Sequence, residues 1–460
     1  MNNNDALWED SNQSDYMNKT RLGLDEALIR QISTDKNEPA WMLEKRLASF
    51  ELFKTKAMPT WGPDLSKLDL TSITYYAKAM DRPAESWDDV PADIKNTFDK
   101  LGIPQAEQEL LAGVGAQYES TAIYHSLKEE LSEQGVIFED LDIALQKYPS
   151  LVEPYFMKAM PSSLHRFAAL HGAVWSGGTF LYIPAGVKIE QPLQAYFRMN
   201  AKGMGQFEHT LIIVESGAQA HYIEGCSAPR YGVDSLHAGG VEIYVKEGAC
   251  FRYSSVESWS KDAYNLNTKR AIVEADAHME WVGGNFGSNT TMLYPCSILK
   301  GDRSSADHLG VAFAGAGQTQ DTGAKVIHLG KDTTSNIVTK SISREGGKAI
   351  YRGLVEISPL ATNAVVSVKC DSLILDDKSQ ADTIPVMKIN NETATISHEA
   401  STGKINAEDL FYLRSRGIKE SEASAMIVNG FIEPITKELP LEYSVEMNRL
   451  VELEMENSIG

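Results

Sequence analysis

The 460-residue chain has no stretch of about 18 uninterrupted apolar residues, so we expect no transmembrane helix. It also lacks basic character, because 63 acidic side chains outnumber 43 basic ones and the net charge is −20. Such a surface repels nucleic acid and anionic membranes, so neither is expected as a principal partner. The polar, acidic first residues lack the basic start and apolar core of a signal peptide, and they lack the arginines of a transit peptide. We therefore expect a cytoplasmic protein.

Several catalytic motifs are missing as well. The chain contains no G-x-x-x-x-G-K-[ST] loop, so we do not expect it to bind ATP as P-loop proteins do. It contains neither the G-x-S-x-G motif of serine hydrolases nor the H-E-x-x-H motif of zinc proteases. A glycine-rich run at residues 310–317 lies in strand-like sequence with no helix after it, which favours close backbone packing over dinucleotide binding.

Cysteine is scarce, with Cys226, Cys250, Cys296 and Cys370 only, and no two of them form a C-x-x-C pair. This spacing argues against a zinc ribbon, a ferredoxin-type cluster motif and a thioredoxin site. Four scattered thiols in a long cytoplasmic chain should be reduced. A metal centre would therefore need ligands from distant parts of the fold or from two chains.

The residue pattern divides the chain into four parts. We predict a flexible tail at residues 1–16, an N-terminal helical region at 17–165, a β-rich core at 166–402 and a C-terminal helical domain at 403–460. Apolar residues at three- and four-residue spacing predict helices in the second part, at residues 24–32, 41–53, 87–101, 105–112 and 120–134.

The β-rich core consists of short β-branched runs separated by turns of one style, such as Gly217-Ala218, Gly248-Ala249 and Asp276-Ala277. In its first part these turns recur at intervals mostly in the high twenties of residues. A loosely repeated turn over such a length predicts a β-solenoid in which each rung stacks on the last. A pair of β-sandwiches is the alternative that the pattern leaves open.

The C-terminal part returns to helical periodicity. Asn406, followed by Glu408 and Asp409, predicts a helix N-cap with acidic residues in the first turn, and a further helix is predicted from about Leu441. Such a tail either covers the open end of the solenoid or presents a docking face to a partner. Composition alone favours the cap.

Cys370 and the neighbouring pair His398-Glu399 supply a thiol, an imidazole and a carboxylate near the end of the core. Iron and sulfide accept these ligand types, although a lone cysteine between apolar residues is more often a small buried hydrophobe. Neighbouring side chains on a strand point to opposite faces. We therefore expect only one of His398 and Glu399 to share a site with Cys370.

Five residues of the core would be unusual inside a solenoid if they pointed inward, namely Arg198, Asn200, Glu257, Trp259 and Lys269. Buried charges need partners, and a polar file is more costly than an apolar one. An inward orientation would therefore indicate transport or catalysis. Orientation toward solvent is the other possibility.

A set of longer motifs is distinctive in combination: IEGCSAP at 223–229, YNLNTKR at 264–270, YRGLV at 351–355, CDS at 370–372, HEA at 398–400 and GFIEP at 430–434. Together they resemble the SufB/SufD family of the SUF iron–sulfur cluster assembly machinery, and the resemblance covers roughly residues 17–460. The two cysteine motifs are similar to those of the SufB branch, and the SufD branch lacks this pair.

The resemblance implies a right-handed parallel β-helix core flanked by N-terminal and C-terminal helical regions. It implies a scaffold for de novo iron–sulfur cluster assembly rather than an enzyme, with ATP hydrolysed by a partner, the ABC-type ATPase SufC. SufC would dock on the C-terminal domain, which is then a docking face as well as a cap. SufD or a second SufB copy would pair with the β-helix. The sulfur donor would be SufE or SufU, acting with the cysteine desulfurase SufS.

The resemblance also assigns residues by position. Cys226 resembles the cysteine that accepts sulfur, Cys370 the cysteine where the nascent cluster forms, and Glu399 a nearby acidic metal ligand. His398 adjoins it as a further cluster-binding candidate. A sulfur path between the two thiols would be lined by Arg198, Asn200, Glu257, Trp259 and Lys269. A shielded path suits a persulfide, which is reactive and easily reduced. The implied cofactors are a transient iron–sulfur cluster, expected to be of the 4Fe-4S type, and reduced flavin (FADH2).

Three positions depart from the family pattern. Glu257 stands where glutamine is usual, His209 where arginine is usual, and Ser397 where an acidic residue is usual. Two alternatives to the scaffold are a SufD-like structural subunit and a β-helix carbohydrate-active enzyme. The cysteine motifs argue against the first, and the missing export signal argues against the second.

Overall fold

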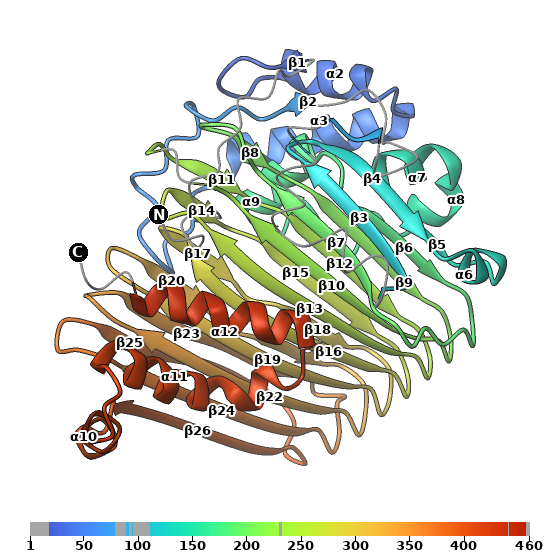
Figure 1. Cartoon of the computed structure of the whole chain (residues 1–460). Coiled ribbons are helices and arrows are strands. Elements are labelled where there is room, and N and C mark those ends of the chain that lie inside the picture. The colour runs from blue at the N-terminus through green and yellow to red at the C-terminus, as the bar shows by residue number, and fades with distance from the viewer. Residues whose placement is uncertain are drawn as a thin grey trace.

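The computed structural model describes residues 18–78, 89–91, 94, 111–229, 232–439 and 441–456. The predicted tail at 1–16 lies outside these residues, as do most of the helical segments predicted at 87–101 and 105–112. Two large sheets form the centre of the described chain, with one group of helices toward its N-terminus and another toward its C-terminus (Figure 1). The fold is therefore mainly β, as the sequence predicts.

The first sheet has ten strands within the described residues, and its neighbouring strands are parallel except for the hairpin β3–β4. In chain order they are β3 (Gly113–Tyr118), β4 (Thr121–Leu127), β7 (Leu193–Arg198), β10 (Gln219–Ser227), β13 (Cys250–Trp259), β16 (His278–Gly287), β19 (Ser305–Ala314), β22 (Thr334–Ser343), β24 (Val365–Ile374) and β26 (Thr395–Lys404).

The second sheet has fourteen strands by the same count, and only β5 runs antiparallel to its neighbour. They are β5 (Ile137–Asp140), β6 (Thr179–Ile183), β8 (Gly205–Gln206), β9 (His209–Val214), β11 (Ser235–His237), β12 (Gly240–Val245), β14 (Ala263–Asn265), β15 (Thr268–Val273), β17 (Thr290–Leu293), β18 (Cys296–Leu299), β20 (Thr319–Thr322), β21 (Lys325–His328), β23 (Lys348–Ile357) and β25 (Gln380–Ile389). A separate antiparallel pair joins β1 (Asn18–Lys19) to β2 (Ala77–Lys78).

The chain passes from the first sheet to the second and back, and each such circuit, here called a coil, pairs in parallel with the next. Residues paired in register across neighbouring coils are separated by 26 to 32 positions, as in Tyr264 with Thr290 and Lys348 with Gln380. This arrangement is a parallel β-solenoid. The β-sandwich alternative is wrong, because sandwiches are built from antiparallel strands.

The repeated turns explain how the coils stack. The first residues of three successive turns, Gly217, Gly248 and Asp276, have φ angles of 69°, 66° and 58°. Glycine adopts this left-handed conformation without strain, and aspartate tolerates it better than most residues. The alanine that follows each of them is buried in the solenoid core. The small pair therefore lets the chain turn sharply from one sheet into the other.

The N-terminal helices are α2 (Glu26–Asp35), α3 (Ala40–Thr55), α6 (Glu129–Glu133), α7 (Leu141–Lys147), α8 (Pro149–Val152) and α9 (Arg166–Val174). They confirm the helices predicted at 24–32 and 41–53. The helix predicted at 120–134 is wrong over most of its length, because 121–127 form strand β4. The β3–β4 hairpin extends the first sheet by pairing β3 with β7, and this long-range pairing overrides the local helical spacing.

The C-terminal helices are α10 (Ala407–Ser415), α11 (Glu420–Thr436) and α12 (Leu441–Glu456). The Asn406 side chain accepts a hydrogen bond from the Glu408 N–H at 3.0 Å, so the predicted N-cap is confirmed. Helices α11 and α12 lie across the outer face of the first sheet (Figure 1), where Val428 and Ile432 belong to one apolar cluster with Val256 and other sheet residues.

These helices do not cover the open end of the solenoid, so the cap interpretation is wrong. The last coil, β25 with β26, is largely exposed, and its apolar residues Ile384, Val386 and Ile389 are 37%, 43% and 48% exposed. The outer face of the first sheet is apolar along several coils and attracts the helices instead. No helix in the described part of the chain is long and apolar enough to cross a membrane.

A buried ion pair lies where helix α3 packs against the end of helix α9, just before strand β6 of the second sheet. Arg46 on α3 donates to both carboxylate oxygens of Glu38, at 2.5 and 2.8 Å, and to the carbonyls of Ala173 and Trp175, at 3.2 and 2.9 Å. Burial alone would raise the pKa of Glu38, but the Arg46 guanidinium holds it below its usual value of 4.5.

Replacing Arg46 tests how much this pair stabilises the fold. Arg46→Met leaves Glu38 buried without its partner, so the free energy of unfolding at pH 7 should fall by about 3–5 kcal/mol in urea denaturation. The matched control Arg30→Met removes an exposed pair with Glu26 and should cost less than about 1 kcal/mol.

The Arg46 effect should also depend on pH. Because the folded state lowers the pKa of Glu38, the stabilisation is present above the unfolded value of about 4.5 and is lost as the pH falls through the folded value. A cost no larger than that of Arg30→Met, or a cost that does not shrink in acid, would contradict this account of the pair.

Candidate functional site

The interior of the solenoid contains a polar cluster around Cys226, which lies on β10 and is buried. The five residues that were unusual for an interior are all at most 1% exposed, so their orientation toward solvent is excluded: Arg198, Asn200, Glu257, Trp259 and Lys269. Strand alternation places Cys226 on the inner face with Tyr222, and in-register pairing places Glu257 of β13 beside Cys226.

One ammonium group binds two carboxylates beside the thiol. Lys269 Nζ lies 2.7 Å from Glu257 Oε1 and 3.4 Å from Glu224 Oε1. The Cys226 thiol lies 3.9 Å from that same oxygen of Glu224. Burial raises the pKa of Glu224, while Lys269 holds the pKa of Glu257 below its usual value despite burial. Burial, followed by the nearby carboxylates, also raises the pKa of Cys226.

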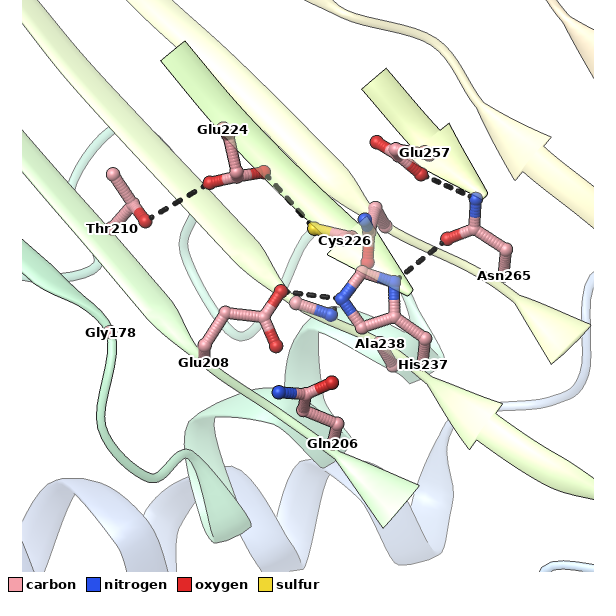
Figure 2. A network of polar contacts seen from close by, with 12 residues as sticks. Gly178, Gln206, Glu208, Thr210, Glu224, Cys226, His237, Ala238, Glu257 and Asn265 are labelled. Atoms are coloured by element: carbon pink, nitrogen blue, oxygen red, sulfur yellow. Dashed lines mark hydrogen bonds and ion pairs between the residues drawn. The ribbon is translucent and has the colours of Figure 1, made fainter. Parts of the chain in front are cut away.

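A hydrogen-bonded chain continues from Glu257 to a second coil (Figure 2). Asn265 Nδ2 donates to Glu257 Oε2 at 2.6 Å, and Asn265 Oδ1 lies 2.9 Å from His237 Nδ1. His237 Nε2 then lies 2.5 Å from Glu208 Oε1. Although burial lowers the basicity of an imidazole, the Glu208 carboxylate raises the pKa of His237 above its usual value.

Sequence reasoning identified Cys226 but missed its partners Glu208, Glu224, His237 and Asn265. Glu224 carries a usable signal, because it lies two residues before Cys226 on the same strand and must share its face. Asn265 lies in one of the quoted motifs. Glu208 and His237 belong to other coils and carry no local signal, so only the folded arrangement brings them to the thiol.

Three of these side chains offer a donor set for a metal ion. One oxygen of Glu208, the sulfur of Cys226 and one ring nitrogen of His237 all lie within 4.8 Å of one another, and all three residues are buried. Among the described residues, it is the one group of three histidine, cysteine or acidic side chains whose ligand atoms lie this close together.

Arg198 and Asn200 lie at the N-terminal side of this cluster. Arg198 is paired in register with Ser227, the residue after Cys226, and donates to its hydroxyl at 2.8 Å. The backbone N–H of Asn200 donates to Glu119 Oε1 at 2.9 Å. Strand alternation thus gives Arg198 the face of Ser227 and not that of the Cys226 side chain. Asn200 is buried beyond the end of β7.

Cys370 lies on β24, also on the inner face and also buried. Its sulfur is 4.0 Å from His398 Nε2, and it makes hydrogen bonds with the side chains of Thr339 and Tyr351. Burial raises the pKa of the Cys370 thiol.

Strand β26 separates His398 from Glu399 as alternation predicts. His398 is in register with the inward-facing Val368, whereas Glu399 is in register with the exposed Lys369. The structure thus brings His398 and Cys370 together and leaves Glu399 exposed on the opposite face of the strand.

A register-matched row of inner positions connects the two thiol regions. Starting at Glu224, two residues from Cys226, the row continues through Ser255, Gly283, Gly310 and Thr339 to Cys370. Five strand-to-strand steps of about 4.8 Å make this a distance of ~24 Å. An interior cavity of about 50 Å³ is lined by residues of this row together with Lys269 and Tyr351. Small side chains therefore leave room between the two thiol regions.

A larger groove lies on the outer side of the second sheet, with a volume of about 580 Å³. Its lining combines aromatic and apolar residues with four cations of the outer side, namely Lys56, Arg166, Arg270 and Lys325. In a chain with net charge −20, this concentration of positive charge distinguishes the groove from the average surface. Strand β15 carries both Arg270 on the groove side and Lys269 on the interior side.

The chain is similar to known proteins along nearly its whole length. Residues 197–431 match the family described as SUF system FeS cluster assembly, SufBD core domain, and residues 30–195 match the SufBD protein N-terminal region. The iron-sulfur cluster assembly protein SufB of Bacillus subtilis (strain 168) is 53% identical over 96% of this chain and 95% of its own length. An iron-sulfur cluster assembly SufBD family protein of Staphylococcus aureus (strain MRSA252) has the same identity and coverage.

Burial of the thiols predicts their order of chemical reactivity. Cys250 is exposed, whereas Cys226, Cys296 and Cys370 are buried. Brief treatment of the folded chain with iodoacetamide should therefore label Cys250 at least tenfold faster than the other three, because the thiolate must contact the reagent. Peptide mass spectrometry measures the rates, and the urea-unfolded chain, in which all four should react alike, is the control. Equal labelling of Cys226 and Cys250 in the folded chain would contradict the burial of the site.

Proposed function

Since the chain belongs to the SufBD family and functions in iron–sulfur cluster assembly by the SUF system, we propose that it is a scaffold that accepts sulfur at Cys226 and holds a nascent cluster at Cys370. The observation that carries this proposal is the pair of buried thiol regions joined by one row of small inner residues. An interior route of this kind shields a reactive sulfur species from solvent and reductants.

The first step is sulfur transfer to Cys226. The Cys226 thiolate attacks the terminal sulfur of a donor persulfide, the donor S–S bond breaks and the donor thiolate leaves, so Cys226 becomes a persulfide without net oxidation. Burial raises the pKa of Cys226, and the Lys269 ammonium opposes this rise. Lys269 is therefore the residue that we propose to stabilise the thiolate and the persulfide anion.

The cationic groove supports entry of an anionic sulfur donor from the outer side of the second sheet. Positive charge attracts a persulfide anion, and strand β15 links the groove to the interior through Lys269. We propose this face for the donor, SufE or SufU, acting with the desulfurase SufS. Arg198, Asn200, Glu257, Trp259 and Lys269 would line the first part of the sulfur path.

The cluster would form at the last coils of the solenoid. Cys370 supplies the thiolate ligand and His398, 4.0 Å from its sulfur, an imidazole from the same face. Glu399 would join the ligand set only if β26 changed its orientation so that its outer face met Cys370. Docking of a partner on this exposed terminal coil would allow such a change. The proposed cluster is of the 4Fe-4S type, and it is cargo of the scaffold. Each sulfane sulfur must gain two electrons to become sulfide, and reduced flavin (FADH2) is the proposed source.

Two exposed surfaces are available for the remaining partners. The terminal coil exposes Ile384, Val386 and the unpaired edges of β25 and β26, which suits SufD or a second copy of this chain. The C-terminal helix α10 exposes Phe411 and Tyr412, which suits the ATPase SufC.

A SufD-like structural role does not account for the two buried thiol sites. A carbohydrate-active enzyme would need carboxylates that a polymer can reach, whereas Glu224 and Glu257 are fully buried.

The cluster site can be tested by anaerobic co-expression with the SUF partners. Cys370→Ala should reduce the visible absorption and the bound iron and sulfide at least tenfold, because the thiolate ligand is removed, while partner association stays unchanged. The matched control Cys296→Ala removes a buried thiol of the second sheet and should retain the wild-type cluster content. Equal content in both variants would move the cluster ligands away from Cys370.

The ATPase docking face can be tested on α10. Phe411 is 73% exposed, so Phe411→Glu should spare the fold and weaken SufC association at least tenfold in a pull-down or titration. Leu22→Glu, at an exposed position near the N-terminus, is the control and should bind SufC normally. Phe431 of the GFIEP motif is less suitable, because it is half-buried with Lys340 Nζ 4.3 Å from its ring centroid. Unchanged binding of the Phe411 variant would exclude α10 as the docking face.

A further inference from the structure

Three ligand-type side chains converge inside the solenoid although they come from different segments. Glu208 lies between β8 and β9, Cys226 on β10 and His237 at the end of β11. Their nearest oxygen, sulfur and nitrogen atoms lie within 4.8 Å of one another, and Figure 2 shows the three side chains turned toward a common point. The mixture of carboxylate, thiolate and imidazole is one that Fe²⁺ and Zn²⁺ accept.

The hydrogen bonds of His237 leave one ring nitrogen for a metal. Asn265 Nδ2 donates to Glu257, so its Oδ1 faces His237 and accepts a hydrogen bond from Nδ1–H at 2.9 Å. Nε2 is therefore the nitrogen that faces Glu208 and Cys226. A metal-binding histidine usually donates its other ring N–H to a fixed acceptor in this way, which orients the ring and selects the tautomer.

Glu208 has a carboxylate oxygen to spare. Its Oε1 contacts His237, whereas its buried Oε2 has no hydrogen-bond partner among the described residues. A buried oxygen without a partner carries a desolvation cost that a bound cation would remove. Gly239 makes room for this carboxylate, because a Cβ at position 239 would overlap Glu208 Oε1.

The surrounding charges also favour a cation. Three buried carboxylates, Glu208, Glu224 and Glu257, converge on this region, and one buried lysine, Lys269, is shared by two of them. Among the described residues, Lys269 and His237 are the cationic groups paired with these carboxylates, and Arg198 lies beyond them at Ser227. Because the three carboxylates outnumber the one lysine, a divalent ion between His237 and Glu208 would offset their excess negative charge.

We propose that Glu208, Cys226 and His237 form an internal binding site for one divalent transition-metal ion of the Fe²⁺ or Zn²⁺ class, with the fourth position open. The site is separate from Cys370, which lies ~24 Å away along the solenoid. It deepens the proposed function, since a metal at Cys226 would hold the sulfur acceptor as a thiolate. The binding itself does not depend on sulfur transfer or on a cluster at Cys370.

Co²⁺ is the probe, because a thiolate bound to Co²⁺ gives a charge-transfer absorption that water-bound Co²⁺ lacks. The full chain carrying Cys250→Ser and Cys370→Ser retains two buried thiols, Cys226 and Cys296. Under anaerobic conditions, titration should give one equivalent of Co²⁺ with the thiolate band. Adding Cys226→Ser should abolish the band, and adding the matched change Cys296→Ser should leave it unchanged.

Two further variants separate metal binding from a loss of folding. Asn265→Ala keeps all three ligands but removes the group that orients His237, so Co²⁺ should bind about 10–100-fold more weakly while the band persists at saturation. Glu208→Gln preserves the shape of a ligand and should weaken binding at least as much. Circular dichroism melts are recorded for every variant, and only variants that melt cooperatively are compared.

The results separate this proposal from the cluster scaffold. A thiolate band that survives Cys226→Ser, that disappears with Cys296→Ser, or that never forms in the Cys250→Ser/Cys370→Ser chain would overturn the internal site. None of these results changes the expectation for Cys370→Ala in cluster assembly. Conversely, a Cys226-dependent band would support the internal site even if Cys370→Ala retained its cluster content.

Discussion

Parallel, in-register stacking of the coils is the constraint on which the rest of this structure depends. Because each coil repeats the path of the one before, a residue on the inner face lies directly above its counterpart one coil away. Side chains that are about 30 positions apart in sequence thus become neighbours in rows. One row carries the aromatic residues Tyr222, Tyr253 and Trp281, with ring centroids 5.6 and 5.1 Å apart, and fills the core. The adjacent row, from Glu224 to Cys370, is small in its middle and leaves space.

The same stacking makes a charged interior possible. An isolated buried ammonium or carboxylate would be too costly, but the coils present several partners to each charge. Lys269 contacts two glutamates, and Glu257 in turn accepts from Asn265 and Trp259. The neighbouring strands fix these positions and so hold the cluster in its geometry. The thiol of Cys226 is held within this charged environment, which controls whether it carries a proton.

How much of this could be predicted from sequence depended on the range of the interactions. Short-range rules were sufficient for the solenoid turns, for the Asn406 cap and for the separation of His398 from Glu399, because each follows from the conformation of adjacent residues. The error at 120–134 arose from pairing of β3 with the distant β7. The tail covers a sheet face rather than the open end for a similar reason, since the apolar outer residues of several coils combine only in the fold. Glu208 and His237 could not have been found, because nothing near either residue indicates Cys226.

The three departures from the family pattern have different structural consequences. Ser397 is exposed on the face of β26 opposite Cys370, so an acidic residue there would not have faced the thiol. His209 lies 2.9 Å from His171 and 3.1 Å from Glu242, in a buried network apart from the Cys226 cluster.

Glu257 is the departure that lies beside Cys226, and both of its oxygens are hydrogen-bonded. Its two oxygens accept from Lys269 at 2.7 Å, from Asn265 at 2.6 Å and from Trp259 at 3.4 Å. All three groups are donors, so a carboxylate matches them, whereas the amide nitrogen of a glutamine would face one donor with another. The extra negative charge therefore strengthens the hold on Lys269 and, through Asn265, on the orientation of His237. In this chain the substitution reinforces the framework of the site, and after burial and Glu224 its charge also raises the pKa of the Cys226 thiol.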